Sequence, residues 1–299
     1  MAAVIASSLL AFSLLLVGVN ALMVDYYAET CPGVEEAVEE AVKKATANDN
    51  TVPAALLRMH FHDCFIRGCD GSVLVDSQGN NTAEKDGPPN ISLHAFYVID
   101  NAKKAVEELD AVAISGGPTW EVPTGRKDGK ISRASDTSQL PAPTFNFSQL
   151  KQSFSQRGLS TGNLVALSGG HTLGFAHCSS FQNRIHNFDS TNDVDPSMNP
   201  TFADSLRKAC PAHNKVRSAG SAMDSTNTVF DNAYYELLLQ GKGLFSSDEA
   251  LLTHRKTMEL VARFADSQKA FERAFVKAMI RMSSLTGGDG VRLDCRVVT

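Results

Sequence analysis

The stretch that decides the fold runs from residue 57 to residue 72 and reads Leu-Arg-Met-His-Phe-His-Asp-Cys-Phe-Ile-Arg-Gly-Cys-Asp-Gly-Ser. Pro53 lies shortly before it, where the first turn of a helix tolerates a missing N–H, so we expect a helix over about 53–63. Arg58 and His62 then lie one turn apart on the same face of that helix. A base and a fixed cation aimed at one point suit a reaction in which a proton moves while negative charge develops on an oxygen.

The loop that follows the predicted helix is rich in oxygen ligands. Asp63, Asp70 and Ser72 offer side-chain oxygens, and the carbonyls of Ile66 and Gly68 lie between them. Hard oxygen ligands at this density suit Ca²⁺. A solvated acidic turn explains the same spacing equally well, so the residues alone leave both interpretations open.

A transition-metal site formed by His60, His62, Asp63 and Cys64 is a weaker alternative. On a helix, His60 is turned about 160° away from His62, because the two are separated by two residues. A disulfide between Cys64 and Cys69 would also consume the thiolate that such a site requires.

A second histidine segment covers residues 164–174 and reads Leu-Val-Ala-Leu-Ser-Gly-Gly-His-Thr-Leu-Gly. Its periodicity predicts a helix over about 163–173, in which Leu164, Leu167 and His171 share one face. Taken alone, a histidine at the end of an apolar stripe is more often a core residue with a satisfied hydrogen bond than a ligand.

The rest of the chain is dominated by helical periodicity. With 299 residues, 43% of them hydrophobic, the chain is long enough for one large unit or two tightly joined lobes. Strand-like alternation is scarce, so the fold class is mainly α with long loops. The further predicted helices cover about 33–47, 95–109, 147–156, 232–239, 259–264 and 269–285, and the main loops cover 78–92, 115–123, 133–144 and 187–201.

Charge and the N-terminus restrict the partners and the compartment. The formal net charge is −5 and no basic block stands out, so a nucleic-acid partner is disfavoured. Residues 1–21 are predicted to be a signal peptide cleaved after Ala21, because the apolar run of about 9–19 is too short to span a bilayer as an anchor. The protein is therefore expected to be secreted, with no membrane association after cleavage.

Secretion makes disulfides plausible for the six cysteines. Six cysteines allow 15 pairings, and spacing alone suggests only the short Cys64–Cys69 loop. Three Asn-x-Ser/Thr sequons, at Asn80, Asn90 and Asn146, are individually weak signals that agree with secretion.

Together, the two histidine segments resemble the signatures of the plant secretory (class III) haem peroxidases. Residues 58–72 are similar to the distal motif of that family, and residues 166–174 to its proximal motif. The resemblance covers nearly all of 22–299 and continues through Glu84-Lys85-Asp86, 115–120, Leu140-Pro141-Ala142-Pro143, Phe230-Asp231-Asn232 and 292–298. It implies a two-lobed, mainly α fold in which haem lies between a distal half of about 22–150 and a proximal half of about 151–299.

The resemblance also implies roles for individual residues. His171 would be the proximal ligand of the haem iron, and its other ring nitrogen would donate to Asp248. His62 would be the distal base that moves the peroxide proton, and Arg58 would stabilise the developing charge. Asn90 would accept a hydrogen bond from His62, which leaves its sequon unused.

The implied cofactors are one haem b and two Ca²⁺ ions, and the implied activity is reduction of H₂O₂ with one-electron oxidation of phenols by a secreted, extracellular or cell-wall monomer. Phe61 would be the distal aromatic residue at the haem, and Pro141 would lie at the exposed haem edge where phenols bind. The distal Ca²⁺ would be held by Asp63, Ile66, Gly68, Asp70 and Ser72. The proximal Ca²⁺ would be held by Thr172, Asp224, Thr226, Val229 and Asp231.

The chain departs from the family pattern after Leu109, which is followed directly by Asp110. Family members carry a two-cysteine helical segment of about four turns at this point. Cys64–Cys69 and Cys178–Cys210 still match family disulfides, whereas Cys31 and Cys295 lose their family partners. Since each lost disulfide costs about 2–5 kcal/mol, a non-catalytic, extracellular Ca²⁺-binding protein that fails to hold haem is the alternative function.

Overall fold

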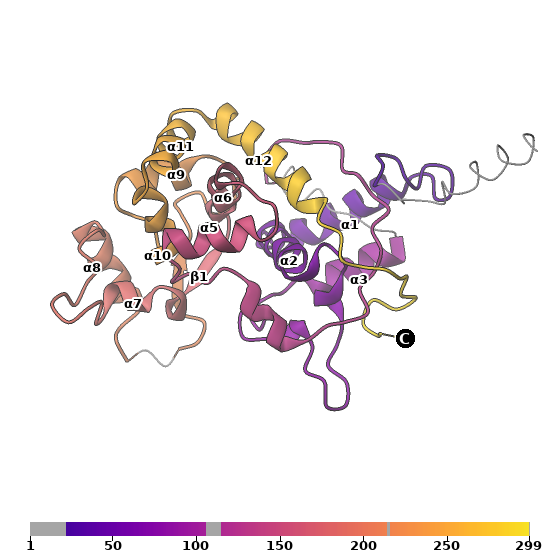
Figure 1. Ribbon diagram of the computed structural model, residues 1–299, viewed down its shortest axis with the longest axis horizontal. Helices are drawn as coiled ribbons and strands as arrows, with labels where there is room; N and C mark the ends of the chain where they lie inside the picture. Colours follow the sequence, from indigo (N-terminus) through magenta and orange to yellow (C-terminus); the bar gives the residue numbers. More distant parts are fainter. Residues whose placement is uncertain (1–21, 106–114, 214–215, 299) are drawn as a thin grey trace, which may run out of the picture.

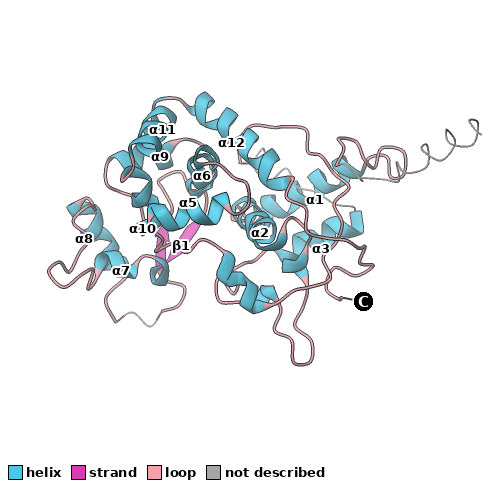
Figure 2. Cartoon of the chain, in the orientation of Figure 1, coloured by secondary structure: helices cyan, strands magenta, loops and turns pink. Residues whose placement is uncertain are grey.

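The computed structural model describes residues 22–105, 115–213 and 216–298, and these residues form mainly α-helices (Figure 1, Figure 2). The mainly α prediction is therefore confirmed. The predicted signal peptide and the Leu109–Asp110 junction lie outside the described residues. Within the described residues, no helix is both long enough and apolar enough to cross a bilayer.

Three helices near the N-terminus form one packed group. They are α1 (Val34–Asn48), α2 (Val52–Arg67) and α3 (Phe96–Ala105). Helix α1 packs against both α2 and α3, and Val38, Val42 and Leu56 are almost completely buried between them. Helix α2 begins with Pro53 in its first turn, as the sequence predicts, and runs four residues beyond the predicted end at 63.

A second group carries the largest core. It comprises α5 (Phe147–Ser155), α6 (Thr161–Ser168), α9 (Ala233–Leu239), α10 (Ser246–Glu249), α11 (Arg255–Asp266) and α12 (Gln268–Ser283). Phe230, Tyr235, Phe271 and Phe275 are fully buried, and their rings pack edge to face or stacked at 4.7–5.6 Å between centroids. Helix α12 contacts both α6 and α2, so it joins this group to the first one.

A third, smaller unit lies at the left of Figure 1. It contains α7 (Gln182–Ile185), α8 (Pro200–Ala209) and the antiparallel pair β1 (Phe175–His177) and β2 (Gly220–Ala222). The Cys178–Cys210 disulfide links the segment after β1 to the end of α8. The prediction of a loop over 187–201 is wrong for its last residues. Helix α8 already begins at Pro200, because Asn199 caps it and Pro200 suits its first turn.

Two other predicted helices differ from the structure in extent. Helix α6 ends at Ser168, and the chain continues as a 3₁₀ helix over Gly169–Thr172, so the prediction of one helix over 163–173 is wrong. Two adjacent glycines favour this tighter turn, since glycine adds little to α-helix stability. Helix α11 begins four residues before the predicted 259, because His254 caps its N-terminus.

The C-terminal tail returns to the first group of helices. Backbone hydrogen bonds pair Gly290 with Asp128 in both directions, at 2.9 and 3.1 Å. Further along, the Arg296 guanidinium binds both carboxylate oxygens of Asp100 on α3, at 2.6 and 2.7 Å. The first and last parts of the sequence are therefore packed together.

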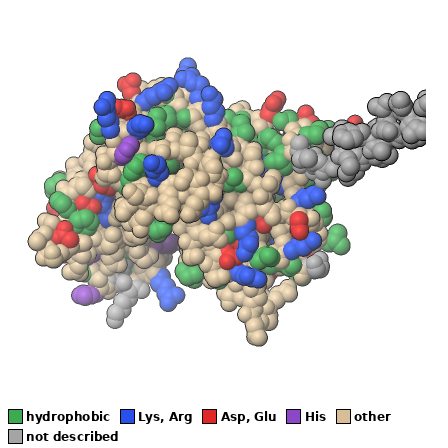
Figure 3. All heavy atoms as spheres, in the orientation of Figure 1, with side chains coloured by type: hydrophobic (Ala, Val, Ile, Leu, Met, Phe, Trp, Pro, Cys, Tyr) green, Lys and Arg blue, Asp and Glu red, His purple; other side chains and the backbone are tan. Residues whose placement is uncertain are grey.

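A cavity of about 140 Å³ lies between α1, α2, α3 and the tail. Its apolar wall includes Val42, Leu56 and Ala102, and Cys295 also lines it. On the molecular surface, acidic and basic side chains are interspersed on the face shown in Figure 3, in keeping with the net charge of −5.

Candidate active site

Helix α2 and the loop at 89–92 position the distal residues. His62 is buried, and its Nδ1 donates to Oδ1 of Asn90 at 2.6 Å. Burial, reinforced by the positive charge of Arg58, lowers the pKa of His62 to about 3, although the bond to Asn90 acts in the opposite direction. The imidazole is therefore neutral near pH 7, and its Nε2 is free of a proton and able to accept one.

Arg58 is held by the same loop. Its Nη1 donates to Oγ of Ser92 at 3.0 Å and its Nη2 to the carbonyl of Pro89 at 2.8 Å. The residue keeps surface exposed to solvent, although burial of the guanidinium lowers its pKa. Arg58 and His62 thus lie together as the sequence predicts, with the cation fixed and still accessible.

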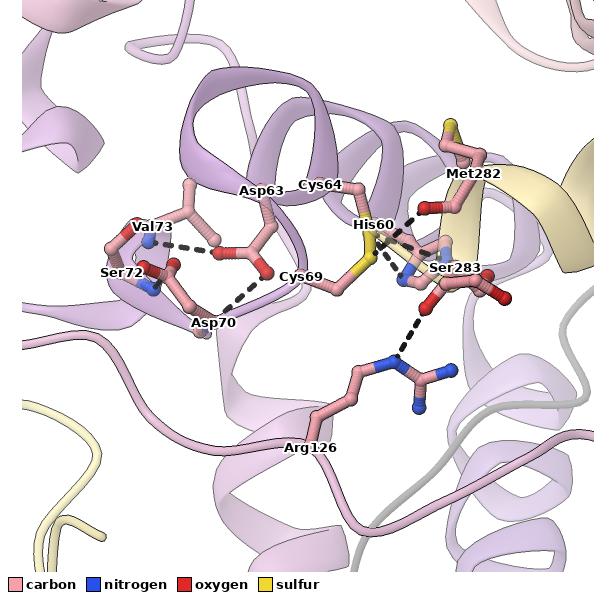
Figure 4. Close-up of a disulfide and its surroundings, with 12 residues drawn as sticks. His60, Asp63, Cys64, Cys69, Asp70, Ser72, Val73, Arg126, Met282 and Ser283 are labelled. Carbon is pink, nitrogen blue, oxygen red and sulfur yellow. Dashed lines mark hydrogen bonds between the residues drawn. A yellow bond between two sulfur atoms is a disulfide. The ribbon is translucent and has the colours of Figure 1, made fainter. Parts of the chain in front are cut away.

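Phe61 and His60 take different sides of α2. The Phe61 ring is partly buried and stacks on Phe65, with 4.7 Å between centroids. His60 faces away from His62, and its Nε2 lies 2.8 Å from Oγ of Ser283 (Figure 4). Burial lowers the pKa of His60 to about 4, helped by the charge of Arg126, so this side chain is also neutral.

The alternative transition-metal site does not form. His60, Cys64 and Cys69 do lie with ligand atoms within 4.8 Å of one another, but Cys64 and Cys69 form a disulfide and offer no thiolate. His62 and Asp63 point to other partners, because His62 binds Asn90 and Asp63 accepts from backbone N–H groups.

The proximal residues gather around His171, which lies in the 3₁₀ helix rather than in α6. Its Nδ1 donates to Oδ1 of Asp248 at 2.8 Å. The side chain is 39% exposed and, within the described residues, its Nε2 has no hydrogen bond. A buried core histidine is therefore the wrong interpretation of this residue.

Asp248 is buried and accepts three hydrogen bonds. Besides His171, the Tyr234 hydroxyl donates to Oδ1 at 2.9 Å, and the Phe245 N–H donates to Oδ2 at 2.9 Å. Burial acts to raise the pKa of Asp248, but the interaction with His171 and the other hydrogen bonds outweigh it and lower the pKa. The carboxylate is thus ionised and fixes the orientation of the His171 ring.

The two histidine segments pack against each other. A Cβ built on Gly170 would lie 3.5 Å from Cδ2 of Leu57, and one built on Gly174 would lie 3.2 Å from Cβ of Ala54. Leu57 and Ala54 belong to the first half of α2, so the His171 turn and the helix of His62 are direct neighbours.

These residues fit a haem ligand set. An accessible histidine nitrogen whose ring is oriented by a carboxylate through the other nitrogen is the arrangement expected of an axial ligand. A neutral histidine and an exposed arginine provide the base and the cation that a bound peroxide would meet. Pro141, predicted at the haem edge, is partly buried, and Pro143 in the same loop accepts from the Ser247 N–H beside Asp248 at 2.9 Å.

The residues of the predicted distal calcium loop are buried, which rules out a solvated turn. Asp63, Asp70 and Ser72 are at most 8% exposed, and the fully buried Glu84 joins them through Ser72 Oγ at 3.0 Å (Figure 4 shows the first three). Burial and the charge of Asp70 raise the pKa of Asp63 to about 7, and burial is also the main cause that raises the pKa of Glu84 to about 8. Three buried carboxylates outnumber the nearby guanidinium groups of Arg67 and Arg292, and such a cluster fits a hard cation such as Ca²⁺.

The backbone of this loop is equally constrained. Ile66 is buried near the end of α2, and Gly68 has a φ of +93°, where a Cβ would lie 2.6 Å from the carbonyl carbon of Thr286. Only glycine avoids that contact. The carbonyls of both residues thus remain candidates for the predicted ligand set.

Glu84 connects this loop to His62, a link that the sequence does not reveal. Ser72 Oγ donates to Glu84 Oε2, the Glu84 carbonyl accepts from Asn90 Nδ2 at 2.8 Å, and Asn90 Oδ1 accepts from His62. The three-residue match Glu84-Lys85-Asp86 was the only signal in the sequence, and it assigned no role to the glutamate.

The predicted proximal calcium residues also come together. The Thr172 hydroxyl donates to Asp224 Oδ2 at 2.6 Å and lies 3.0 Å from Asp231 Oδ1. Thr226 donates its N–H to Asp224 at 2.8 Å, and Val229 donates its N–H to the Thr226 carbonyl at 2.7 Å. One hydroxyl hydrogen cannot serve two carboxylates at once, so this set has an excess of oxygen acceptors that fits a cation.

The cysteines divide into two groups. Cys64–Cys69 and Cys178–Cys210 are disulfides. Cys31 and Cys295 are free thiols, and they do not bond to each other.

Comparison with known proteins identifies the family. The family model described as peroxidase matches residues 38–267. Peroxidase 64 of Arabidopsis thaliana is 65% identical over 297 residues, covering 94% of each chain, and Peroxidase 66 of the same plant is 52% identical over 281 residues, covering 88% of this chain and 87% of its own. Peroxidase 5 of Vitis vinifera is 42% identical over 300 residues, covering 93% of this chain and 91% of its own. These matches do not favour the non-catalytic alternative, and they agree with the mainly α peroxidase fold. The chain therefore belongs to the plant class III peroxidase family and is a peroxidase, an H₂O₂-dependent oxidoreductase.

Proposed function

We propose that the protein binds one haem b at His171 and uses H₂O₂ to oxidise small phenols in one-electron steps. The observation that carries this proposal is the pair of oriented histidines, His62 on Asn90 and His171 on Asp248, on neighbouring segments. When bound, the haem would supply the redox chemistry that no side chain here provides.

The side chains would handle protons and charge. His62 Nε2 accepts the proton of the incoming peroxide and returns it to the departing oxygen, because burial keeps the ring neutral and Asn90 fixes its orientation. Arg58 stabilises the negative charge on that oxygen. Phe61 would contact the haem on the side of His62, and phenols would approach near Pro141.

Haem titration of the purified chain tests this proposal. The unaltered chain should bind one haem with a Soret band and oxidise a phenolic dye with peroxide. His171→Ala should lose the tight haem binding, while His254→Ala, which removes a cap of α11 and a ring stacked on Phe147, should retain it. A chain that takes up no haem under conditions where it is folded would contradict the proposal.

Two Ca²⁺ ions are proposed at the buried oxygen clusters. The distal site would use Asp63, Ile66, Gly68, Asp70 and Ser72, and the proximal site would use Thr172, Asp224, Thr226, Val229 and Asp231. Each adjoins a histidine of the active site, since Asp63 follows His62 and Thr172 follows His171.

The proposed mature protein is a secreted monomer comprising residues 22–299, with the signal peptide 1–21 removed and halves that divide near residue 150. Of the three sequons, Asn90 is buried against His62 and Asn146 caps α5, whereas Asn80 is exposed in a turn. Asn80 is accordingly the proposed glycosylation site, and mass spectrometry of the secreted protein before and after glycosidase treatment tests it.

The proposal includes a missing segment after Leu109. The match to Peroxidase 64 spans 297 aligned positions, yet 94% of the 299 residues of this chain is about 281, which leaves about 16 positions without a residue of this chain. The free thiols of Cys31 and Cys295 support the same interpretation. Inserting a two-cysteine helical segment after Leu109 should convert both thiols into disulfides, as mapped by mass spectrometry, and sharpen thermal unfolding. Two thiols that stay free after the insertion would contradict it.

A further inference from the structure

The carboxylate that orients His171 is shared with a second side chain. Oδ1 of Asp248 accepts from His171 Nδ1 at 2.8 Å and from the Tyr234 hydroxyl at 2.9 Å. We propose that Tyr234 is a positioning residue that limits how much negative charge Asp248 directs at His171, and thereby sets the reduction potential of the haem iron. The inference rests on the proposed function, in which His171 is the iron ligand.

The position of Tyr234 is fixed by its surroundings. It lies on α9, is 3% exposed, and packs edge to face against Tyr235 with 5.0 Å between centroids. Its ring also meets the His171 ring at 87°, with 5.7 Å between centroids. The described residues give its hydroxyl one acceptor, which is Asp248.

The hydroxyl remains a donor under all physiological conditions. Burial, the charge of Asp248 and the hydrogen bond to that carboxylate raise the pKa of Tyr234 well above its usual value. Tyr234 therefore never becomes an acceptor that would reverse the bond.

The shared oxygen creates competition between two donors. Phe245 N–H occupies Oδ2, so Asp248 cannot turn a free oxygen toward His171. Each hydrogen bond that a carboxylate accepts withdraws charge from the others it accepts. Without the Tyr234 hydroxyl, Oδ1 would act on the His171 N–H alone, and the ring would become a stronger electron donor, which favours the ferric iron.

The test compares two tyrosine variants of the haem-loaded enzyme. Tyr234→Phe removes the competing donor and should shift the ferric–ferrous equilibrium about threefold toward the ferric form, a midpoint about 28 mV more negative at 59 mV per tenfold. The band of the iron–histidine stretch in the resonance Raman spectrum of the ferrous protein should move to higher frequency, since the bond strengthens.

Tyr235→Phe is the matched control. Its hydroxyl is equally buried on the same helix, but it donates to the carbonyl of Val165 at 2.8 Å instead of to Asp248. Both variants should lose some thermal stability, whereas the potential and the Raman band should move only in Tyr234→Phe.

The outcomes separate this inference from the proposed function. Haem bound with a normal Soret band, together with an unchanged potential and Raman band in Tyr234→Phe, would overturn the inference alone. Equal shifts in both variants would also overturn it, because they would report a general loosening of α9. Failure of the unaltered chain to bind haem would overturn the proposed function, and this inference with it.

Discussion

His62 and His60 lie two residues apart on α2 but have different partners. His62 binds Asn90 and has the proposed chemical role, whereas His60 binds Ser283 and has a structural one. We expect His62→Ala to lower the second-order rate of reaction with H₂O₂ by about 10²–10⁴-fold while haem stays bound through His171. His60→Gln should leave that rate within about twofold, because His60 contacts Ser283 and not the distal side. Stopped-flow mixing of each haem-loaded variant with peroxide measures both rates, and an unchanged rate in His62→Ala would refute the assigned role.

The same two histidines predict acid sensitivity. Their pKa values are lowered to about 3 and about 4 by burial, whereas an unfolded histidine titrates near 6.5. Between pH 6.5 and 4 the unfolded chain binds more protons than the native one, so the free energy of unfolding must fall as the pH falls.

Urea titrations at saturating Ca²⁺ over this range measure the slope. Each histidine should contribute up to about 1.4 kcal/mol per pH unit. His60→Gln should flatten the profile by removing one of the two contributions. Identical slopes in the two proteins would show that His60 is not buried as a neutral group.

At the residue scale, helix spacing predicted that Arg58 and His62 lie together, and the resemblance to the peroxidases supplied Asn90, His171 and Asp248. The structure brings these residues together in the two expected groups. Neither source predicted Glu84 or Tyr234. Both act through hydrogen bonds between residues distant in sequence: Glu84 through Ser72 and Asn90, and Tyr234 through Asp248. No periodicity or motif spacing encodes such contacts, because they depend on how separate elements pack.

At the scale of elements, Ca²⁺ binding at the distal calcium loop should change how the stability of the protein depends on pH. Without Ca²⁺, native Asp63 and Glu84 keep their protons up to a pKa of about 7 and about 8, while the unfolded chain releases them near 4. At these two carboxyls the native state then binds more protons over that range, so without Ca²⁺ their contribution to the free energy of unfolding should fall as the pH rises from 4 to 8.

Chelation should therefore lower the melting temperature more at pH 8 than at pH 5, and adding Ca²⁺ back should restore it. Calorimetry with and without chelator at both pH values measures the difference. In Asp63→Asn the response to Ca²⁺ should be weaker, since one charged ligand is lost. An equal effect of the chelator at both pH values would contradict the link.

Some helices were predicted closely, whereas the ten-residue α8 and the shortest elements were not predicted. Helices α1, α5, α9 and α12 lie within about two residues of their predicted limits, because each has a sustained apolar face. Helices α7 and α10 have four residues each, and β1 and β2 have three. Segments of that length carry too little periodicity to detect, and they form where the surrounding chain supplies their contacts.

At the scale of the whole molecule, filling the cavity beside α1, α2 and α3 should stabilise the protein. Ala102→Leu should fill part of its volume of about 140 Å³ and raise the free energy of unfolding by about 0.5–2 kcal/mol. Ala278→Leu on the densely packed α12 is the matched control, and it should lower that free energy by about 1–3 kcal/mol. Urea unfolding of the three proteins measures both changes, and destabilisation by both substitutions would show that the cavity is closed in solution.

Folding of the N-terminal half depends on the C-terminal tail, which is synthesised last. Arg292 donates to the carbonyl of Gly71 at 2.7 Å, and the Arg296 carbonyl accepts from the Asp76 N–H at 2.9 Å, so the last residues brace the loop next to Asp70. A ribosome adds these arginines more than 200 residues after the loop they brace. The N-terminal half therefore cannot complete its fold while it emerges, and a chain released a few residues early lacks contacts at its beginning as well as at its end.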